Sequence, residues 1–241
     1  MTGATLIVIA SLIVMVAVAI SIEGRSPGAR EIALVGALAA VAAAGRVLTA
    51  GIPSVQPVTL ICLVAGGTLG LRVGLSVGPL AVLISNGFLG HGPWTPGQMA
   101  LWALVGVSGA ALAGLVRNRW ILVAAAGVWG PLFGWGMNLW SLAVFGPTVS
   151  WAAFVASGAR SLPFEVAGGV GNVVLAVSAG PALTRLLQRY AARCDLVVVA
   201  APETGSPLAR PPWRADTPAR CAIRRPVRRA VTRRGREARD D

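Results

Sequence analysis

The sequence predicts an all-α integral membrane protein, in which a bundle of six helices is preceded by one additional N-terminal transmembrane helix. Composition is the first observation behind this class. Of the 241 residues, 55% are apolar and only 12% are charged, about half the charged fraction of a soluble domain. The second observation is that the apolar residues form charge-free stretches of about 20, the length at which a helix crosses a bilayer. A soluble, fibrous or disordered chain is therefore excluded.

Seven spans follow from these stretches and from the polar or proline-containing segments that separate them. Residues 4–22 have no basic segment before them and no small-residue cleavage site after them. We interpret them as a retained anchor, with removal as a signal peptide as the alternative. Pro53 and Pro57 end the second span, and Arg72 marks a return to the membrane surface. The predicted spans are residues 4–22, 32–50, two within 58–90, 99–116, 120–146 with a kink at Gly130-Pro131, and 163–187, with a loop at 147–162.

The arginines predict the orientation of these spans, because positively charged connections stay on the cytoplasmic side of a membrane. With the N-terminus outside and the C-terminus in the cytoplasm, the connections around Arg25, Arg72 and Arg117 are cytoplasmic. The outer connections 51–57 and 91–98 contain no arginine. The chain is accordingly predicted to divide into an N-terminal helix and turn at 1–31, a six-helix substrate-binding body at 32–190 and a tail at 191–241.

The tail is rich in arginine and proline and has no apolar periodicity. It is predicted to be a disordered cytoplasmic segment that contributes to orientation and attracts anionic lipids. Nucleic-acid binding is disfavoured, because Trp213 is its single aromatic residue.

Polar residues within the predicted spans gather in the outer half of the membrane, whereas the inner half is almost entirely Leu, Val, Ala and Gly. This asymmetry predicts a cavity open to the outside. A channel would distribute polar groups through the whole thickness of the membrane. The candidate ligand-binding residues are Arg46, Gln56, Asn86, Trp94, Gln98, Asn138, Glu165 and Asn172.

These candidates also have structural interpretations. Arg46 and Glu165 could neutralise one another as an ion pair, and the asparagines could join neighbouring helices by hydrogen bonds. Trp94 could cover the cavity or belong to an interfacial aromatic belt. Trp135, together with Asn138, could stack on and hydrogen-bond a flat ligand.

The chain has few residues suited to catalysis. It contains one histidine and three cysteines without metal-binding spacing, so no metal or cofactor is expected. Gly106-Val107-Ser108-Gly109 matches the GxSG nucleophile motif of rhomboid proteases. The required histidine is missing, however, because His91 precedes the serine and lies in a predicted loop. These residues favour binding or carrying a molecule over converting it.

Small residues recur at four-residue spacing on the second predicted span, in the sets Ala33, Ala37, Val41 and Gly36, Ala40, Ala44. They form a smooth face on which another helix can pack closely, either a partner's helix or one of the body's own. A similar series at Gly66, Gly70, Gly74 and Gly78 is discounted, because the turn predicted at Arg72 divides it.

Four motifs occur in order within residues 45–99: Gly45-Arg46-Val47-Leu48, Pro53-Ser54-Val55-Gln56-Pro57-Val58-Thr59, Ser85-Asn86-Gly87-Phe88-Leu89-Gly90, and Gly92-Pro93-Trp94-Thr95-Pro96 with Gln98-Met99. In order, spacing and topology they resemble the substrate-specific (S) components of energy-coupling factor (ECF) transporters, particularly actinobacterial members. The resemblance extends more loosely from Arg30 to about Arg189.

The resemblance implies a six-helix subunit of the bacterial plasma membrane that binds a vitamin-like micronutrient outside. Such a subunit joins a transmembrane T component and two cytosolic ATPases. Ala33 and Ala37, with Ala40 beside them, match the family's AxxxA pattern, which contacts the T component. The family requires neither the N-terminal helix nor the arginine-rich tail. The alternative is a stand-alone secondary carrier, for which Glu165 would be the available intramembrane carboxylate.

Overall fold

The computed structural model describes Val16, Ile20 and residues 28–146 and 149–199. In this part of the chain the regular structure is entirely helical, which confirms the predicted all-α class. The helices are α2 (Ala29–Leu48), α3 (Val58–Leu69), α4 (Leu71–Leu89), α5 (Thr95–Ala111), a short 3-10 turn η1 (Leu115–Arg117), α6 (Arg119–Phe145), α7 (Trp151–Ser178) and α8 (Gly180–Val199). The predicted span at 4–22 lies outside the described residues apart from Val16 and Ile20, which are helical.

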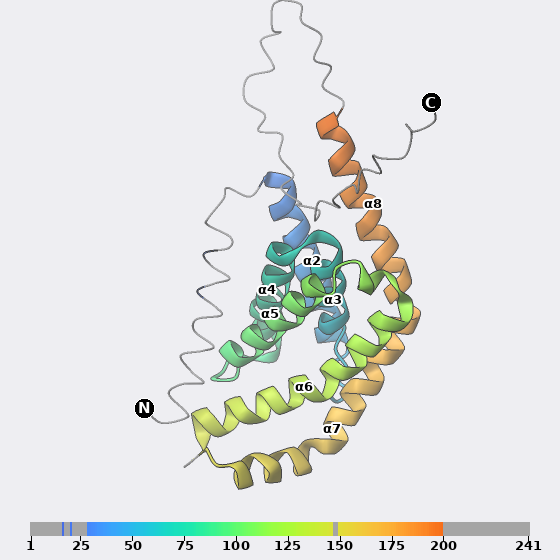
Figure 1. Cartoon of the computed structure of the whole chain (residues 1–241). Coiled ribbons are helices and arrows are strands. Elements are labelled where there is room, and N and C mark those ends of the chain that lie inside the picture. Colours follow the sequence, from blue (N-terminus) through green and yellow to red (C-terminus); the bar gives the residue numbers. More distant parts are fainter. Residues whose placement is uncertain (1–15, 17–19, 21–27, 147–148, 200–241) are drawn as a thin grey trace, which may run out of the picture.

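The helices form two groups that meet along α3, α5 and α8. Helices α2, α3, α4 and α5 pack against one another, and α6 lies along α7 as an extended pair that projects from this group (Figure 1). Helix α8 begins where α7 ends and packs against α3. The cavity described below lies at the junction between the two groups.

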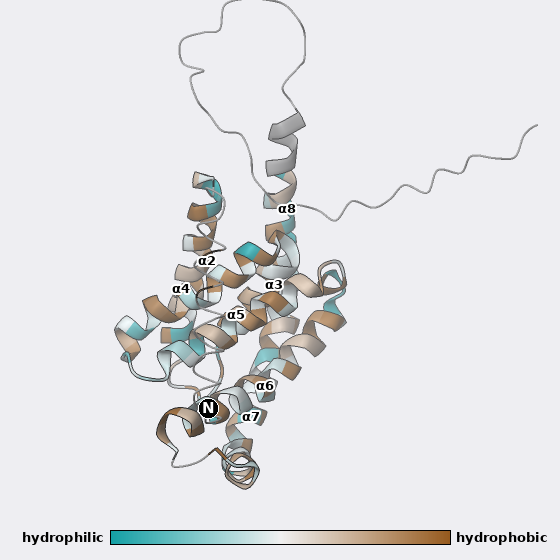
Figure 2. Cartoon of the chain, turned by 60° about the vertical axis from the view of Figure 1, so that its left-hand side comes forward, coloured by the Kyte–Doolittle hydropathy of each residue, from teal (hydrophilic) through white to brown (hydrophobic). Residues whose placement is uncertain are grey.

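Four of the described helices are long and apolar enough to cross a membrane, namely α2, α4, α6 and α7. Helices α3 and α5 are shorter, with 12 and 17 residues. Large apolar side chains point outward, as at Val128 (56% exposed) and Val170 (57%), while Arg46 and Glu165 are buried. Hydrophobic residues occur around most of the helical surface (Figure 2). This distribution is that of a membrane-embedded protein, whose surface is solvated by lipid.

The last third of the chain corrects the prediction of a loop at 147–162 and a span starting at Pro163. Helix α7 already begins at Trp151, because the Ser150 side chain accepts a hydrogen bond from the Ala153 amide at 3.2 Å and so caps the helix. Pro163 lies inside α7. The helix ends at Ser178, and α8 continues to Val199, past residue 190 where the body was predicted to end. The rest of the predicted tail, residues 200–241, lies outside the described residues.

The connection between α3 and α4 is a single glycine. Gly70 has φ +98°, a left-handed conformation that costs a glycine little because it has no Cβ. The turn therefore falls just before Arg72, which lies in the first turn of α4 and pairs with Glu31 at 3.9 Å.

Three members of the glycine series, Gly66, Gly74 and Gly78, make close helix contacts, which corrects the expectation that the turn removes the role of the series. The turn at Gly70 folds both halves of the series onto α5. A Cβ added at Gly66 or at Gly74 would overlap the carbonyl oxygen of Gly106, and one added at Gly78 would lie 2.7 Å from Cβ of Trp102. The missing side chains let the three backbones approach, as in other membrane helix pairs.

The GxSG motif at residues 106–109 of α5 takes part in these close helix contacts. Gly106 packs on the backbone of Gly74, and Gly109 packs on the backbone of Leu63. The Ser108 hydroxyl donates to the Val105 carbonyl at 2.7 Å and accepts from Nε1 of Trp129 at 2.8 Å. The motif is thus a helix-packing surface, and its serine joins α5 to α6.

We expect Gly106→Ala to destabilise the bundle at the upper end of the roughly 1–3 kcal/mol typical of overpacking. The added methyl group overlaps the backbone of α4, which cannot move aside as a flexible side chain does. The melting temperature of the purified protein in detergent measures this effect. The control is Gly87→Ala on α4, where nothing lies within 4 Å of the added Cβ. Equal melting temperatures for the two variants would show that the backbones are not in close contact.

Candidate functional site

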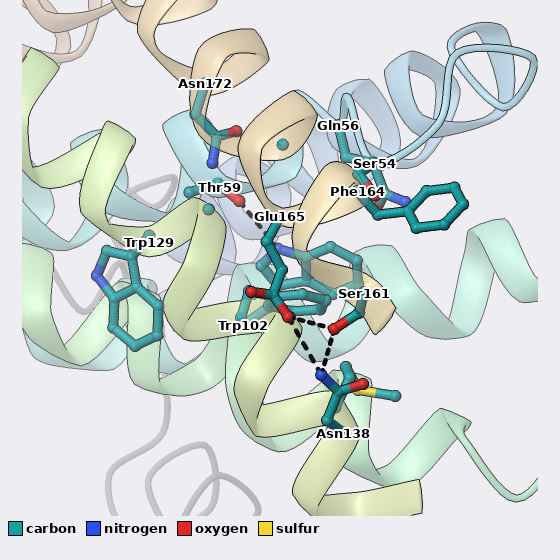
Figure 3. Close-up of a pocket in the computed structure, with 15 residues that line it drawn as sticks. Ser54, Gln56, Thr59, Trp102, Trp129, Asn138, Ser161, Phe164, Glu165 and Asn172 are labelled. Atoms are coloured by element: carbon teal, nitrogen blue, oxygen red, sulfur yellow. Dashed lines mark hydrogen bonds between the residues drawn. The ribbon is translucent and has the colours of Figure 1, made fainter. Parts of the chain in front are cut away.

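A cavity of about 290 Å³ lies between the loop after α2, helices α3 and α5, and the α6–α7 pair (Figure 3). Four aromatic side chains line it: Trp102, Trp129, Phe133 and Phe164. Its polar lining consists of Ser54, Gln56, Thr59, Asn138, Ser161, Glu165 and Asn172. An apolar wall with a few convergent polar groups is typical of a small-molecule site.

Among the described residues, Glu165 is the one charged residue that lines this cavity. Its side chain is 3% exposed and accepts hydrogen bonds from three donors. Oε1 accepts from the Ser161 hydroxyl at 2.5 Å and from Nδ2 of Asn138 at 3.1 Å, and Oε2 accepts from Nε1 of Trp135. A carboxylate has about four lone-pair positions, so three donors leave capacity for one more.

The polar groups around Glu165 are held by the helix geometry of α7. Ser161, Glu165, Gly168 and Asn172 all line the cavity, and their spacing of four, three and four places them on one face of the helix. Asn138 reaches this face from α6 and also donates to the Ser161 oxygen at 2.6 Å. The carboxylate is therefore fixed in position before any ligand enters.

The opposite wall is aromatic. Trp102, which is 1% exposed, donates from Nε1 to the Thr59 hydroxyl at 3.3 Å. Its ring lies 4.4 Å from that of Phe133, centroid to centroid, with the planes tilted by 34°. These contacts fix a flat apolar surface within the same cavity as the carboxylate.

Arg46 lies beside this wall, and its guanidinium donates hydrogen bonds to four side chains of the protein. Its guanidinium donates to Oε1 of Gln56 at 3.2 Å, the Ser85 hydroxyl at 2.7 Å, Oδ1 of Asn86 at 2.6 Å and Oε1 of Gln98 at 3.1 Å. It also lies over the ring of Trp102, 5.0 Å from the centroid. Asn86 completes the network by donating to the Thr95 hydroxyl at 3.0 Å and to Gln98 at 3.2 Å.

The suggested ion pair between Arg46 and Glu165 does not form. Arg46 is held by residues of α4, α5 and the loop after α2, whereas Glu165 is held by residues of α6 and α7. Among the described residues the ion pair that does form joins Glu31 and Arg72. The two charges thus serve separate networks: Glu165 itself lines the cavity, whereas Arg46 contacts it only through Gln56 and Trp102.

The structure brings most of the predicted site residues together. Gln56, Asn138, Glu165 and Asn172 line the cavity, and Arg46, Asn86 and Gln98 form the neighbouring network. Trp94 belongs to neither, since it is 41% exposed and its ring lies against Gly92. Trp140, whose Nε1 donates to the Pro93 carbonyl at 2.8 Å, holds the Trp94 loop.

Sequence reasoning missed Ser161, Thr59, Trp102 and Phe133 as cavity residues. The sequence places Ser161 in the predicted loop at 147–162, because a proline such as Pro163 is common at the first position of a helix. The four-residue spacing from Ser161 to Glu165 was a signal of a shared helix face that could have found it. Trp102 and Phe133 carried no such signal, because a buried aromatic residue in an apolar span is ordinary core.

Comparison with protein-family models, curated proteins and solved structures found no match for the chain. The fold and the cavity define its class: an all-helical, membrane-embedded protein with an internal cavity of ligand size. The assignment within this class depends on the chemistry of the cavity.

Proposed function

We propose that the chain is the membrane-embedded substrate-binding subunit of an ECF-type importer, which captures a vitamin-like micronutrient outside the cell. The observation that carries this proposal is the cavity around Glu165, where a fixed carboxylate with spare acceptor capacity faces aromatic side chains. The four-motif resemblance at residues 45–99 supports the same assignment. In the proposed orientation, in a bacterial plasma membrane, the N-terminus is outside and the C-terminus is cytoplasmic.

The charges around the cavity favour a particular class of micronutrient. Arg46 does not line the cavity and already uses four of its five N–H donors within the protein, so it is poorly placed to bind an anionic ligand. Glu165 on the lining attracts a cation or a ring amino group, and the aromatic wall accepts a flat ring. We therefore propose a small heteroaromatic ligand that is cationic or carries an amino group.

The cavity volume supports a small ligand. About 290 Å³ corresponds to roughly ten water molecules of liquid and lies at the lower end of ligand pockets. This space suits a compound of one or two rings and not a macrocycle such as cobalamin.

The exposed face of α2 is the proposed contact with a transmembrane T component. Ala33, Ala37 and Ala40 are all exposed, while Ala39 and Ala42 on the other side of the helix are fully buried. Small side chains allow close helix packing. Two cytosolic ATPases would supply the energy, since the chain has no ATP-binding motif.

The test of the function is reconstitution. Native mass spectrometry of the purified protein identifies the bound small molecule, and vesicles then measure its uptake with and without the T component and ATPases. ATP-dependent uptake that needs these partners supports the proposal. Uptake by the chain alone that stops when the ion gradient collapses would instead identify a secondary carrier.

We expect Ala37→Trp to abolish assembly with the T component and uptake, while ligand retention stays unchanged. The indole would hold the two helices apart at a face that needs close contact. Co-purification of the T component and uptake in vesicles measure the effect. The control is Ala124→Trp, at an exposed position of α6. Loss of ligand with assembly intact would assign this face to the internal fold.

A further inference from the structure

A second cavity, of about 250 Å³, lies where the start of α6 meets the start of α8. Figure 1 shows the first turns of α6 beside the upper end of α7, where α8 begins. Arg117 and Arg119 line it from η1 and α6, and Thr184, Arg185 and Gln188 line it from α8. The arginine pattern places this end of the bundle on the cytoplasmic side. The cavity is therefore separate from the one around Glu165.

The charge of this cavity is entirely positive. Among the described residues, three arginines and no acidic residue line it. In the described part of the chain, Arg117, Arg119 and Arg185 form no ion pair, the one found there being between Glu31 and Arg72. Arg119 stacks on the ring of Trp120 at 4.5 Å, which orients its guanidinium without neutralising it.

A buried hydroxyl in the lining lacks a partner. Thr184 is 7% exposed, and its Oγ1 is the buried side-chain polar atom without a hydrogen bond in the described residues. Burying a hydroxyl without a partner costs free energy. Thr184 lines the cavity beside the arginines, and its enclosed hydroxyl would reach a ligand's acceptor oxygen after a rotation of the side chain.

The start of α6 adds to the same preference. Helix α6 begins at Arg119, so the N-terminal end of a 27-residue helix borders the cavity. The N-terminus of a helix carries a partial positive charge and attracts anions. The planar guanidinium of an arginine can donate two parallel hydrogen bonds to the oxygens of one phosphate group.

We propose that this cavity binds a phosphate group, either of an anionic lipid in the cytoplasmic leaflet or of a soluble phosphate compound. The bound phosphate joins the start of α6 to the start of α8. Since α6 and α7 form one wall of the Glu165 cavity, this link holds that wall against the rest of the bundle. The site does not depend on the proposed transport function.

The test compares two variants of the full-length protein that each lose two positive charges. Arg117→Gln/Arg185→Gln removes one arginine from each side of the cavity. Arg30→Gln/Arg189→Gln removes two exposed arginines, one of them also on α8, that do not line it. Phosphatidylglycerol retained by the purified protein is measured by native mass spectrometry, and inorganic phosphate affinity by the shift of the melting temperature.

We expect the cavity variant to bind one of these probes at least about tenfold more weakly than the control variant, because two charge-assisted contacts are lost. A selective loss of phosphatidylglycerol identifies a lipid headgroup as the source. A selective loss of phosphate binding identifies a soluble compound. Equal behaviour of the two variants towards both probes would overturn the proposal, because charge alone would then explain any binding.

Discussion

Replacing Glu165 by glutamine is expected to remove most of the bound micronutrient from the purified protein. The carboxylate is the one charge on the cavity lining, and its three contacts all donate to it. Losing one partner of a buried charged hydrogen bond costs about 2–5 kcal/mol, so the Kd for a cationic ligand should rise about 30-fold or more. Native mass spectrometry measures the occupancy of each variant produced in the same cells.

The matched control for this prediction is Glu31→Gln. Glu31 also lies in a membrane-length helix and forms the ion pair with Arg72 at 3.9 Å, but it does not line the Glu165 cavity. Its variant should keep the ligand. If the glutamine variant at position 165 retained the same ligand at wild-type occupancy, the carboxylate would be a helix-joining group and the proposed ligand class would be wrong.

Arg46→Met is expected to cost on the order of 2–5 kcal/mol of folding stability. Methionine removes the guanidinium and leaves the oxygens of Gln56 and Asn86 without their donor, while Gln98 keeps only the donor from Asn86. Buried polar groups without partners are costly, and breaking a buried charged network is among the most destabilising single changes. The melting temperature in detergent should fall well below that of the wild-type protein.

Arg160→Met is the control for this substitution, because Arg160 is exposed on α7 and the same chemical change there leaves no buried acceptor behind. If both variants melted at the same temperature, water would be replacing the guanidinium and Arg46 would contribute little to the fold. Ligand retention in the Arg46 variant, measured at low temperature, then tells how far the network positions Trp102 and Gln56, which line the cavity.

The Arg46 network is expected to influence which ligands the proposed site accepts. It uses acceptors from α4, α5 and the loop after α2 to satisfy a positive charge that would otherwise attract anions to the cavity. Ser85 contributes by donating its own proton to the Ala81 carbonyl at 2.7 Å, which turns its lone pairs towards the guanidinium. In the proposed binding mode the ligand meets one carboxylate, neutral polar groups and aromatic rings.

The sequence by itself determined the class of the protein and most of the polar residues that matter. Helices and their approximate ends follow from hydropathy and from proline and glycine positions, which are local properties of the chain. The sequence also identifies Arg46, Asn86, Asn138 and Glu165 as candidates. A polar residue within an apolar span is costly to bury and must have a partner. The small-residue spacing on α2 was visible in the same way.

Only the tertiary structure decided which partner each polar residue has. The acceptors of Arg46 lie 10 to 52 residues away along the chain, and two of the donors to Glu165 lie 27 and 30 residues away. Hydropathy and periodicity are properties of short windows and carry no information about such distant pairs. The choice between an Arg46–Glu165 ion pair and two separate networks, and the contact of Gly66 and Gly74 with Gly106, were therefore set by how the helices pack.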